Sequence, residues 1–276
     1  MNNTLEQDQL RRQVQERYGA IAQRSGSCCG DGAICGDGVL ESGTDAEKLG
    51  YSADDVVSVP EGSEMGLGCG NPTALASIKP GETVLDLGSG GGFDCFLSAK
   101  QTGPTGRVIG VDMTSEMVSK ARSNAVKGGY ANVEFRLGEI ENLPAADNTA
   151  DLIISNCVIN LSPDKPRVYR ETFRVLKPGG RIAVSDIVAL QPLPEWLIAD
   201  FAAYTGCVAG AASISELETM LTAAGFEQIR IETKASSREF INDWLPGKRA
   251  GDYVASANIT AVKPEKSCCS DQCCSE

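Results

Sequence analysis

The chain has 276 residues, a formal net charge of −12, eleven cysteines and no histidine, a length that allows one large α/β domain with additions or two small domains. The acidic balance argues against nucleic acid or a membrane as partner, because an acidic surface repels phosphate groups and anionic lipids. No apolar run approaches the roughly 20 residues of a membrane span and the N-terminus lacks the apolar stretch of a signal peptide, so we expect a cytoplasmic protein whose cysteines stay reduced.

The first part of the chain, residues 1–67, is predicted to form a helix over 1–24 and then a cysteine-containing loop. Residues 25–45 are rich in Gly, Ser, Asp and Cys, a composition typical of a loop. The cysteines of this loop are Cys28, Cys29 and Cys35.

A regular alternation of strands and helices begins near residue 80 and occupies the predicted core, residues 68–190. The apolar, β-rich runs that predict strands are 83–87, 107–112, 133–137, 151–156 and 181–188. The helical patterns between them are 93–102, 115–127 and 165–176. Such alternation predicts a parallel sheet with right-handed crossovers and helices on both faces. The run Lys-Pro-Gly-Gly at 177–180 predicts a turn before the fifth strand.

Residues 191–265 are predicted to form a capping segment and the last two strands. Helices are expected over 195–205 and 215–224, and strands over 228–233 and 253–262, which brings the number of strands to seven. The tail, residues 266–276, carries two pairs of adjacent cysteines and has the composition of a disordered segment.

A cofactor site is predicted where the first strand enters a glycine-rich turn. Residues 84–92 read Val-Leu-Asp-Leu-Gly-Ser-Gly-Gly-Gly, and glycine is needed where the backbone bends tightly and approaches a ligand. Asp112 ends the next strand, where a carboxylate can accept both hydroxyl groups of a ribose. The spacing Gly-x-Gly-x-Gly-Phe differs from the Gly-x-Gly-x-x-Gly of dinucleotide enzymes, and Asp86 is placed to pair with an amino group of a cofactor.

These motifs resemble those of the class I methyltransferases over roughly residues 80–190. The glycine-rich turn resembles their motif I, residues 138–144 resemble their adenine-contacting loop, and residues 176–180 resemble their turn before strand five. The resemblance implies an α/β, Rossmann-like fold with a seven-stranded, mostly parallel sheet, and S-adenosylmethionine as the methyl donor. It assigns that cofactor to Asp86, Gly88, Ser89, Gly90, Asp112, Met113, Glu139, Ile140 and Asn156.

Three cysteines lie in or beside turns around this core. Cys69 and Cys207 lie in glycine-flanked loops, and Cys157 follows the fourth strand. Loops entering from both sides of the core could bring these three sulfurs together over one methyl group. Cys95, by contrast, lies within an apolar helical segment and is interpreted as a core residue. A zinc site is not indicated, because no Cys-x-x-Cys pair recurs with finger spacing.

The segments around Cys157 and Asp112 resemble the arsenite methyltransferases. Residues 155–165 (Ser-Asn-Cys-Val-Ile-Asn-Leu-Ser-Pro-Asp-Lys) and residues 110–114 (Gly-Val-Asp-Met-Thr) carry the resemblance, which spans most of residues 10–262. It implies that three cysteines hold As(III) and that an N-terminal cysteine joins them during a redox cycle. The three are Cys69, Cys157 and Cys207; the fourth is Cys28 or Cys29, with Cys35 competing for the role.

As(III) is a soft ion that prefers thiolate ligands, and its lone pair needs neither a general base nor a metal cofactor to attack a methyl group. The expected substrates are arsenite and methylated arsenicals, with thioredoxin or glutathione as the external reductant. Two alternatives remain open. One is a class I methyltransferase acting on a carbon, oxygen or nitrogen of a small metabolite, and the other is a thiol-rich metalloid-binding protein. The paired cysteines of the tail could collect arsenic or could be incidental surface thiols.

Overall fold

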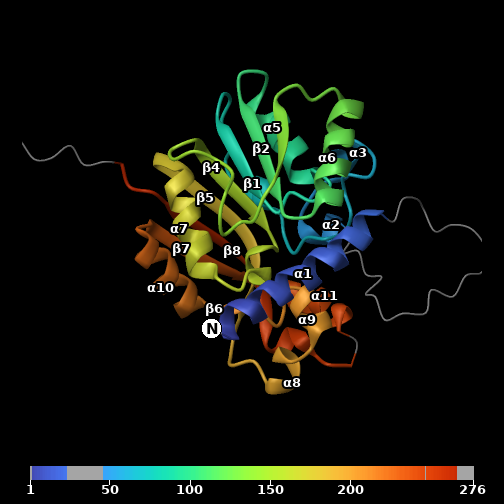
Figure 1. The fold of residues 1–276 in the computed structure, drawn as a ribbon, viewed down its shortest axis with the longest axis vertical. Coiled ribbons are helices and arrows are strands. Elements are labelled where there is room, and N and C mark those ends of the chain that lie inside the picture. Colours follow the sequence, from blue (N-terminus) through green and yellow to red (C-terminus); the bar gives the residue numbers. More distant parts are fainter. Residues whose placement is uncertain (1, 24–45, 246, 266–276) are drawn as a thin grey trace, which may run out of the picture.

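A single mixed sheet forms the centre of the computed structural model, which describes residues 2–23, 46–245 and 247–265 (Figure 1). The strand order is β3-β2-β1-β4-β5-β8-β7, and β6 pairs with β5 off this path. The strands are β1 (Thr83–Leu87), β2 (Arg107–Asp112), β3 (Val133–Leu137), β4 (Ala150–Asn156), β5 (Leu176–Ala189), β6 (Ala212–Ser213), β7 (Glu227–Lys234) and β8 (Val254–Val262). Only β8 runs antiparallel to its neighbours, so the predicted mostly parallel α/β sheet is confirmed.

Two details of the strand prediction are wrong. The sheet has eight strands, not seven, because β6 is only two residues long and so short a strand carries no alternating pattern. Strand β5 also begins at Leu176, five positions before the predicted start. The predicted turn at 177–180 is part of β5, and the pairing of β4 with β5 shifts register there. Leu176 pairs with Ala150, whereas Arg181 pairs with Leu152.

The helices predicted over 1–24, 93–102, 115–127, 165–176 and 215–224 are present, whereas three short helices between residues 46 and 75 were not predicted and the segment after β5 differs from the prediction. The helices are α1 (Asn2–Gln23), α2 (Ala46–Leu49), α3 (Ala53–Val57), α4 (Pro72–Leu75), α5 (Phe93–Thr102), α6 (Ser115–Gly128), α7 (Lys165–Val175), α8 (Glu195–Ile198), α9 (Phe201–Thr205), α10 (Ile214–Ala224) and α11 (Ser237–Trp244). The single helix predicted over 195–205 is two helices, because the Asp200 side chain accepts from the Ala203 N–H at 3.2 Å and starts α9 as a cap. Helix α11 was not predicted. No helix in the described parts of the chain is long and apolar enough to cross a bilayer.

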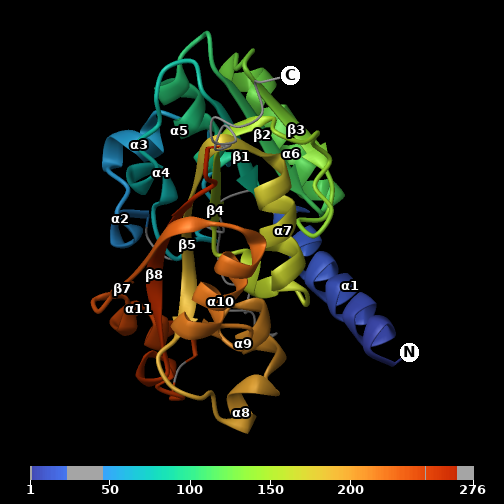
Figure 2. The same cartoon turned by 90° about the vertical axis from the view of Figure 1, so that its left-hand side faces the viewer.

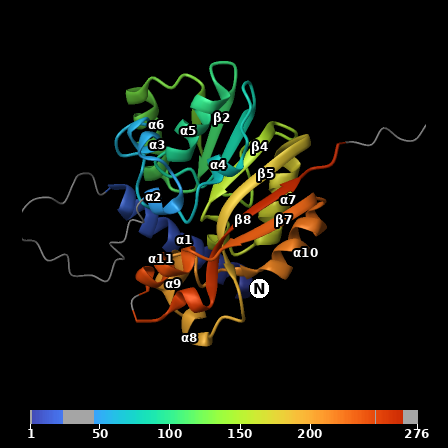
Figure 3. The same cartoon turned by 180° about the vertical axis from the view of Figure 1, so that it is seen from behind.

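Successive strand residues point to opposite faces of the sheet, and each face is covered by its own helices. Val84 packs with Phe96 and Val118 beneath α5 and α6, whereas Leu85 packs with Val168 and Leu217 beneath α7 and α10. Figure 2 shows α5 and α7 on opposite sides of the strands. Helix α1 crosses below the carboxyl ends of the parallel strands (Figures 1 and 3), and its Tyr18 bonds to Thr205 at the end of α9.

Leu85 tests the contribution of this core. The side chain is fully buried, so Leu85→Ala is expected to lower the free energy of unfolding by about 3 kcal/mol, from lost burial and the cavity left behind. Chemical denaturation monitored by circular dichroism measures this change. Val126→Ala is the control, because Val126 on α6 is 83% exposed and its loss should cost under about 0.5 kcal/mol. Equal effects of the two substitutions would contradict the packing described.

Candidate active site

The turn between β1 and α5 forms a cradle at the carboxyl end of the sheet. Gly88 has a φ of +67°, a conformation that favours glycine. A Cβ atom on Gly88 would also lie 2.4 Å from Cγ2 of Val158. The Gly88 N–H donates to the carbonyl of Val111 at 2.8 Å, which ties the turn to the neighbouring strand. The predicted need for glycine here therefore has two independent causes.

A cavity opens from this turn toward the end of β2. It is lined by Gly88, Gly90, Asp112 and Met113, and on its far side by Cys157. The Asp112 carboxylate accepts from the Gly90 N–H at 3.0 Å and from the Thr114 N–H at 2.8 Å. These bonds hold the carboxylate at the cavity wall, where its remaining lone pairs can accept from a ribose.

A second cavity lies on the other side of the same turn. Its wall includes Asp86 and Asp94, and it shares Gly88, Gly90 and Asn156 with the first cavity. Both carboxylates are buried, and within the described parts of the chain neither forms an ion pair with a basic side chain. Two buried carboxyl groups without a basic partner are suited to receive a positively charged group of a ligand.

These features fit S-adenosylmethionine, which joins a nucleoside to an amino acid through a sulfonium centre. The Ser89 hydroxyl lines the second cavity and has no hydrogen-bond partner among the described residues, although it is buried. An unpaired buried hydroxyl is expected to bond to a ligand. The first cavity suits the nucleoside and the second suits the amino acid, and Asn156 lines both cavities.

Most of the residues predicted to bind the cofactor line one cavity or the other. They are Asp86, Gly88, Ser89, Gly90, Asp112, Met113, Ile140 and Asn156. Glu139 is different, because its side chain is exposed and lies outside both cavity walls. Glu141 lines the first cavity instead, and it accepts from the Ser162 hydroxyl at 2.6 Å. After β3 the chain turns, with the Asn142 N–H donating to the Glu139 carbonyl, and this turn directs the second glutamate inward.

Helix α1 closes the first cavity, a role that was not predicted. Arg11 lies 3.5 Å from the Glu141 carboxylate, and Gln15 donates to the Met113 carbonyl at 2.6 Å. The Tyr18 hydroxyl donates to the Thr205 carbonyl at 3.1 Å. Arg11, Val14 and Tyr18 all line the cavity, and their spacing of three and four residues places them on one face of the helix, which is the signal that could have identified them.

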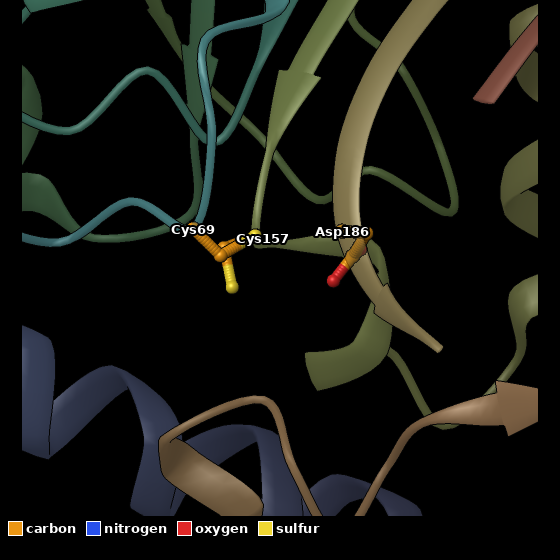
Figure 4. A group of neighbouring side chains, drawn as sticks. All are labelled: Cys69, Cys157 and Asp186. Atoms are coloured by element: carbon orange, nitrogen blue, oxygen red, sulfur yellow. The ribbon is translucent and has the colours of Figure 1, made fainter. Parts of the chain in front are cut away.

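The three predicted thiols come together at the edge of the first cavity. Cys69, Cys157 and Cys207 are 1%, 7% and 2% exposed and belong to one apolar cluster. The sulfurs of Cys69 and Cys157 and a carboxylate oxygen of Asp186 all lie within 4.8 Å of one another (Figure 4). The Cys207 thiol donates to the carbonyl of Cys157 at 2.6 Å.

The backbone at two of these cysteines is strained. Cys157 has a φ of +59° and Cys207 a φ of +63°, in the left-handed region that costs roughly 1–3 kcal/mol for a residue other than glycine. At Cys157 the strained turn reverses the chain at the end of β4, and the Cys157 N–H donates to the Ser185 carbonyl at 2.8 Å. Strain of this kind persists where the surroundings hold a residue in place, as in a binding site.

Burial raises the pKa of the Cys69 thiol, and burial together with the neighbouring thiols of Cys207 and Cys69 raises the pKa of Cys157 well above its usual value. The thiols of Cys69 and Cys157 therefore stay protonated at neutral pH. Because a soft electrophile that binds thiolates displaces these protons, the arrangement can bind such an ion without external charge compensation.

Asp186 is a further acidic residue of the thiol site that was not predicted. Its carboxylate accepts from the Asn160 side chain at 2.9 Å and from the Ile187 N–H at 2.8 Å. Burial raises the pKa of Asp186 to about 6, against the effect of these bonds. An acidic side chain within the apolar run of β5 is rare enough to have marked this position as functional.

The remaining predicted cysteines fall in two groups. Cys95 is buried as expected, and its thiol also donates to the Asp86 carboxylate at 3.2 Å. Cys28, Cys29 and Cys35 lie outside the described residues, as do the cysteines of the tail.

The second cavity predicts a pH dependence of stability. Burial raises the pKa of Asp94 to about 6, above its value of about 4 in the unfolded chain. The folded state then binds this proton more tightly, so ionisation of Asp94 destabilises the fold as the pH rises from about 4 to 6. Asparagine does not ionise, so the Asp94→Asn variant does not lose this stability. The difference in unfolding free energy between the variant and the unsubstituted protein should therefore shift in favour of the variant by about 2–3 kcal/mol between about pH 4 and pH 6. Urea titrations at several pH values measure this difference, and a constant difference would contradict the expectation.

Comparison with known proteins gives the following similarities. A family model described as a methyltransferase domain matches residues 78–225. The chain is 52% identical over 265 residues to an arsenite methyltransferase of Halobacterium salinarum, covering 94% of this chain and 68% of that protein. It is 39% identical over 223 residues to an arsenite methyltransferase of Aquipseudomonas alcaligenes, covering 77% and 63%. The chain thus spans about two thirds of the length of these curated relatives.

A crystal structure of an arsenic(III) S-adenosylmethionine methyltransferase from Chlamydomonas reinhardtii superposes on the chain with a TM-score of 0.59. The two are 33% identical, and the match covers 80% of this chain and 73% of that one. The match therefore covers more of the chain than the predicted core, residues 68–190.

Proposed function

The chain belongs to the arsenite methyltransferase family, and from that premise we propose that it transfers the methyl group of S-adenosylmethionine to As(III) held by Cys69, Cys157 and Cys207. The observation that carries the proposal is the position of Cys157. It lines the cavity of Asp112 and the glycine-rich turn, and its sulfur lies within 4.8 Å of that of Cys69. A metalloid bound by these thiols would face the site of the methyl group.

Binding of arsenite to this site balances as an exchange of ligands. Three protonated thiols replace the three hydroxyl groups of arsenous acid and release three molecules of water. The product is a neutral, pyramidal arsenic centre with one lone pair, and thiolates are its natural ligands. Because Cys157 and Cys207 are held in a fixed, strained backbone conformation, the protein sets the direction of that lone pair.

S-Adenosylmethionine supplies an electrophilic methyl group on a positively charged sulfur. The arsenic lone pair forms a bond to the methyl carbon, and the carbon–sulfur electron pair leaves with S-adenosylhomocysteine. No proton moves, so neither a histidine nor a metal cofactor is required. The chain contributes by placing the two reactants in line, an effect worth up to ~7–11 kcal/mol.

Transfer leaves arsenic formally pentavalent and cationic, so two electrons must return. We assign this step to Cys28 or Cys29, whose thiolate would attack the arsenic-bound sulfur of Cys69. A disulfide forms, the arsenic–sulfur electron pair stays on arsenic, and a trivalent methylated product remains on Cys157 and Cys207. An external dithiol such as thioredoxin, or glutathione, would then reduce the disulfide by exchange. Thiols that must return to the reduced state favour a cytoplasmic location.

Incubation with arsenite, S-adenosylmethionine and a thiol reductant, followed by arsenic speciation, tests the function. Continued formation of methylated arsenicals over many turnovers is expected only when all three components are present. Binding of arsenite without methylation would favour a metalloid-binding protein, and methylation of a small metabolite in place of arsenite would favour another class I methyltransferase.

The redox step makes its own prediction about disulfides. After one turnover without external reductant, mass spectrometry of alkylated peptides should find a bond from Cys69 to Cys28 or Cys29, with Cys157 and Cys207 unpaired. Protein incubated with arsenite alone is the control and should show no such bond. A Cys69–Cys157 disulfide with Cys28 and Cys29 free would reject the pairing.

A further inference from the structure

The carboxamide of Asn156 holds Cys69 from both sides. Its Oδ1 accepts from the Cys69 N–H at 3.0 Å, and its Nδ2 donates to the Gly70 carbonyl at 2.9 Å. The fit is close, because a Cβ atom on Gly68 would lie 2.8 Å from Nδ2. Asn156 is therefore a direct determinant of the course of the backbone at Cys69.

The other polar atoms of Cys69 are held as well. Its carbonyl accepts from the Ser256 hydroxyl at 2.7 Å, and its sulfur contacts the Ser185 carbonyl at 3.5 Å. Since Ser185 and Ser256 lie on the paired strands β5 and β8, they form a rigid base. Among the groups that bond to Cys69, only Asn156 also lines the two ligand cavities.

The Nδ2 group of Asn156 has more acceptors than hydrogens. Besides Gly70, it lies 3.0 Å from the Tyr51 hydroxyl and 3.2 Å from Oδ2 of Asp94. An amide nitrogen carries two hydrogens, so three acceptors compete for them. The hydrogen bond from Nδ2 to the Gly70 carbonyl therefore competes with the hydrogen bonds from Nδ2 to Tyr51 and Asp94.

Asp94 is where a ligand can change this competition. Its Oδ1 accepts from the Tyr51 hydroxyl at 2.6 Å. Asp94 also lines the second cavity together with Asp86, and neither carboxylate has a basic partner among the described residues. An ammonium group bound there donates to Oδ2, and that oxygen then needs the Asn156 hydrogen less. The two hydrogens of Nδ2 then bond to the Gly70 carbonyl and the Tyr51 hydroxyl. The hydrogen bond to Gly70 strengthens, and the backbone on either side of Cys69 is held more firmly.

We propose that Asn156 is a positioning residue that couples occupancy of the amino-acid half of the cofactor site to the arsenic site through Cys69. The inference rests on the proposed function, and it adds that the two ligands bind cooperatively. By linkage, the factor by which the cofactor tightens arsenite binding equals the factor by which arsenite tightens cofactor binding. The second quantity is the simpler one to measure, because arsenite can also bind other thiols of the chain.

The experiment measures binding of S-adenosylhomocysteine to the full chain by calorimetry, with and without saturating arsenite. S-Adenosylhomocysteine carries the same ammonium group as the methyl donor and cannot react. We expect arsenite to tighten its binding at least fivefold. Methylthioadenosine keeps the nucleoside and the sulfur and lacks the ammonium group, so its affinity should change less than twofold.

Variants assign the coupling to the amide. In Asn156→Ala, both ligands should still bind and the coupling should fall below twofold. Asn132→Ala is the matched control and should keep the full coupling, because the Asn132 amide also donates to two backbone carbonyls, those of Ala99 and Gly103, outside both cavities. Should Asn156→Ala fail to fold, Tyr51→Phe decides. The Tyr51→Phe substitution leaves two acceptors, the Gly70 carbonyl and Oδ2 of Asp94, for the two hydrogens of Nδ2. These acceptors then no longer compete, so the coupling between the two ligands should fall at least twofold.

Full coupling in Asn156→Ala, or in Tyr51→Phe where that variant decides, would overturn the inference, and so would equal coupling for methylthioadenosine. Binding of both ligands with no mutual effect in the unsubstituted protein would overturn the inference and leave the proposed function standing. Failure of S-adenosylhomocysteine to bind at all would reject both.

Discussion

Replacing Cys157 or Cys207 by serine is expected to lower the rate of arsenite methylation by more than about 100-fold, because loss of one ligand misplaces the reacting lone pair. A serine oxygen is a hard ligand that As(III) binds poorly compared with a thiolate. Both cysteines are buried in the same cluster, so water cannot readily supply the missing ligand. Initial rates of methylated arsenical formation, measured by chromatography coupled to mass spectrometry, give the effect.

Two controls separate loss of the arsenic site from general damage. S-Adenosylmethionine should bind both variants within about twofold of the unsubstituted protein, since the cofactor cradle is intact. Cys273→Ser makes the same chemical change in the tail and should leave the rate near normal. Near-normal methylation by Cys157→Ser or Cys207→Ser would refute the three-thiol site.

Replacing Asp112 by alanine is expected to weaken S-adenosylmethionine binding about 10- to 100-fold, since a hydrogen bond to a charged group contributes roughly 1.5–3 kcal/mol. The substitution removes the acceptor for the ribose. It also frees the Gly90 N–H and the Thr114 N–H, which the carboxylate holds at 3.0 and 2.8 Å. The glycine-rich turn therefore loses one of its anchors together with the ligand contact.

Calorimetry with S-adenosylmethionine measures this loss, and Glu139→Ala is the matched control. Asp112 ends β2 and Glu139 comes two residues after the neighbouring parallel strand β3. Both were predicted to contact the cofactor, yet of the two only Asp112 lines a cavity. Glu139→Ala should change the affinity less than twofold. Comparable losses in both variants would show that the cofactor binds in a different place from the one described.

The sequence alone predicted the fold class and most of the residues that gather at the candidate site. Buried parallel strands are continuous apolar runs, which is why the bounds of β1 and β2 were predicted to the residue. The edge strand β3 was predicted to the residue as well, from its alternation of apolar and polar residues. The glycine-rich turn and Asp112 were also predictable, because the turn directly follows β1, Asp112 ends β2, and their chemistry depends on these positions. The three cysteines could be selected from eleven because they adjoin turns at this edge.

Only the tertiary structure decided which distant residues complete the site. Asn156 and Cys69 are 87 positions apart, and Asp186 reaches the thiols because β5 lies beside β4. No local pattern records such pairs, since they depend on strand order and register. The choice of Glu141 over Glu139 likewise depends on how one turn is hydrogen-bonded. Local periodicity specifies elements, whereas the contacts that tie Cys69 to the cofactor cavities arise only when those elements pack.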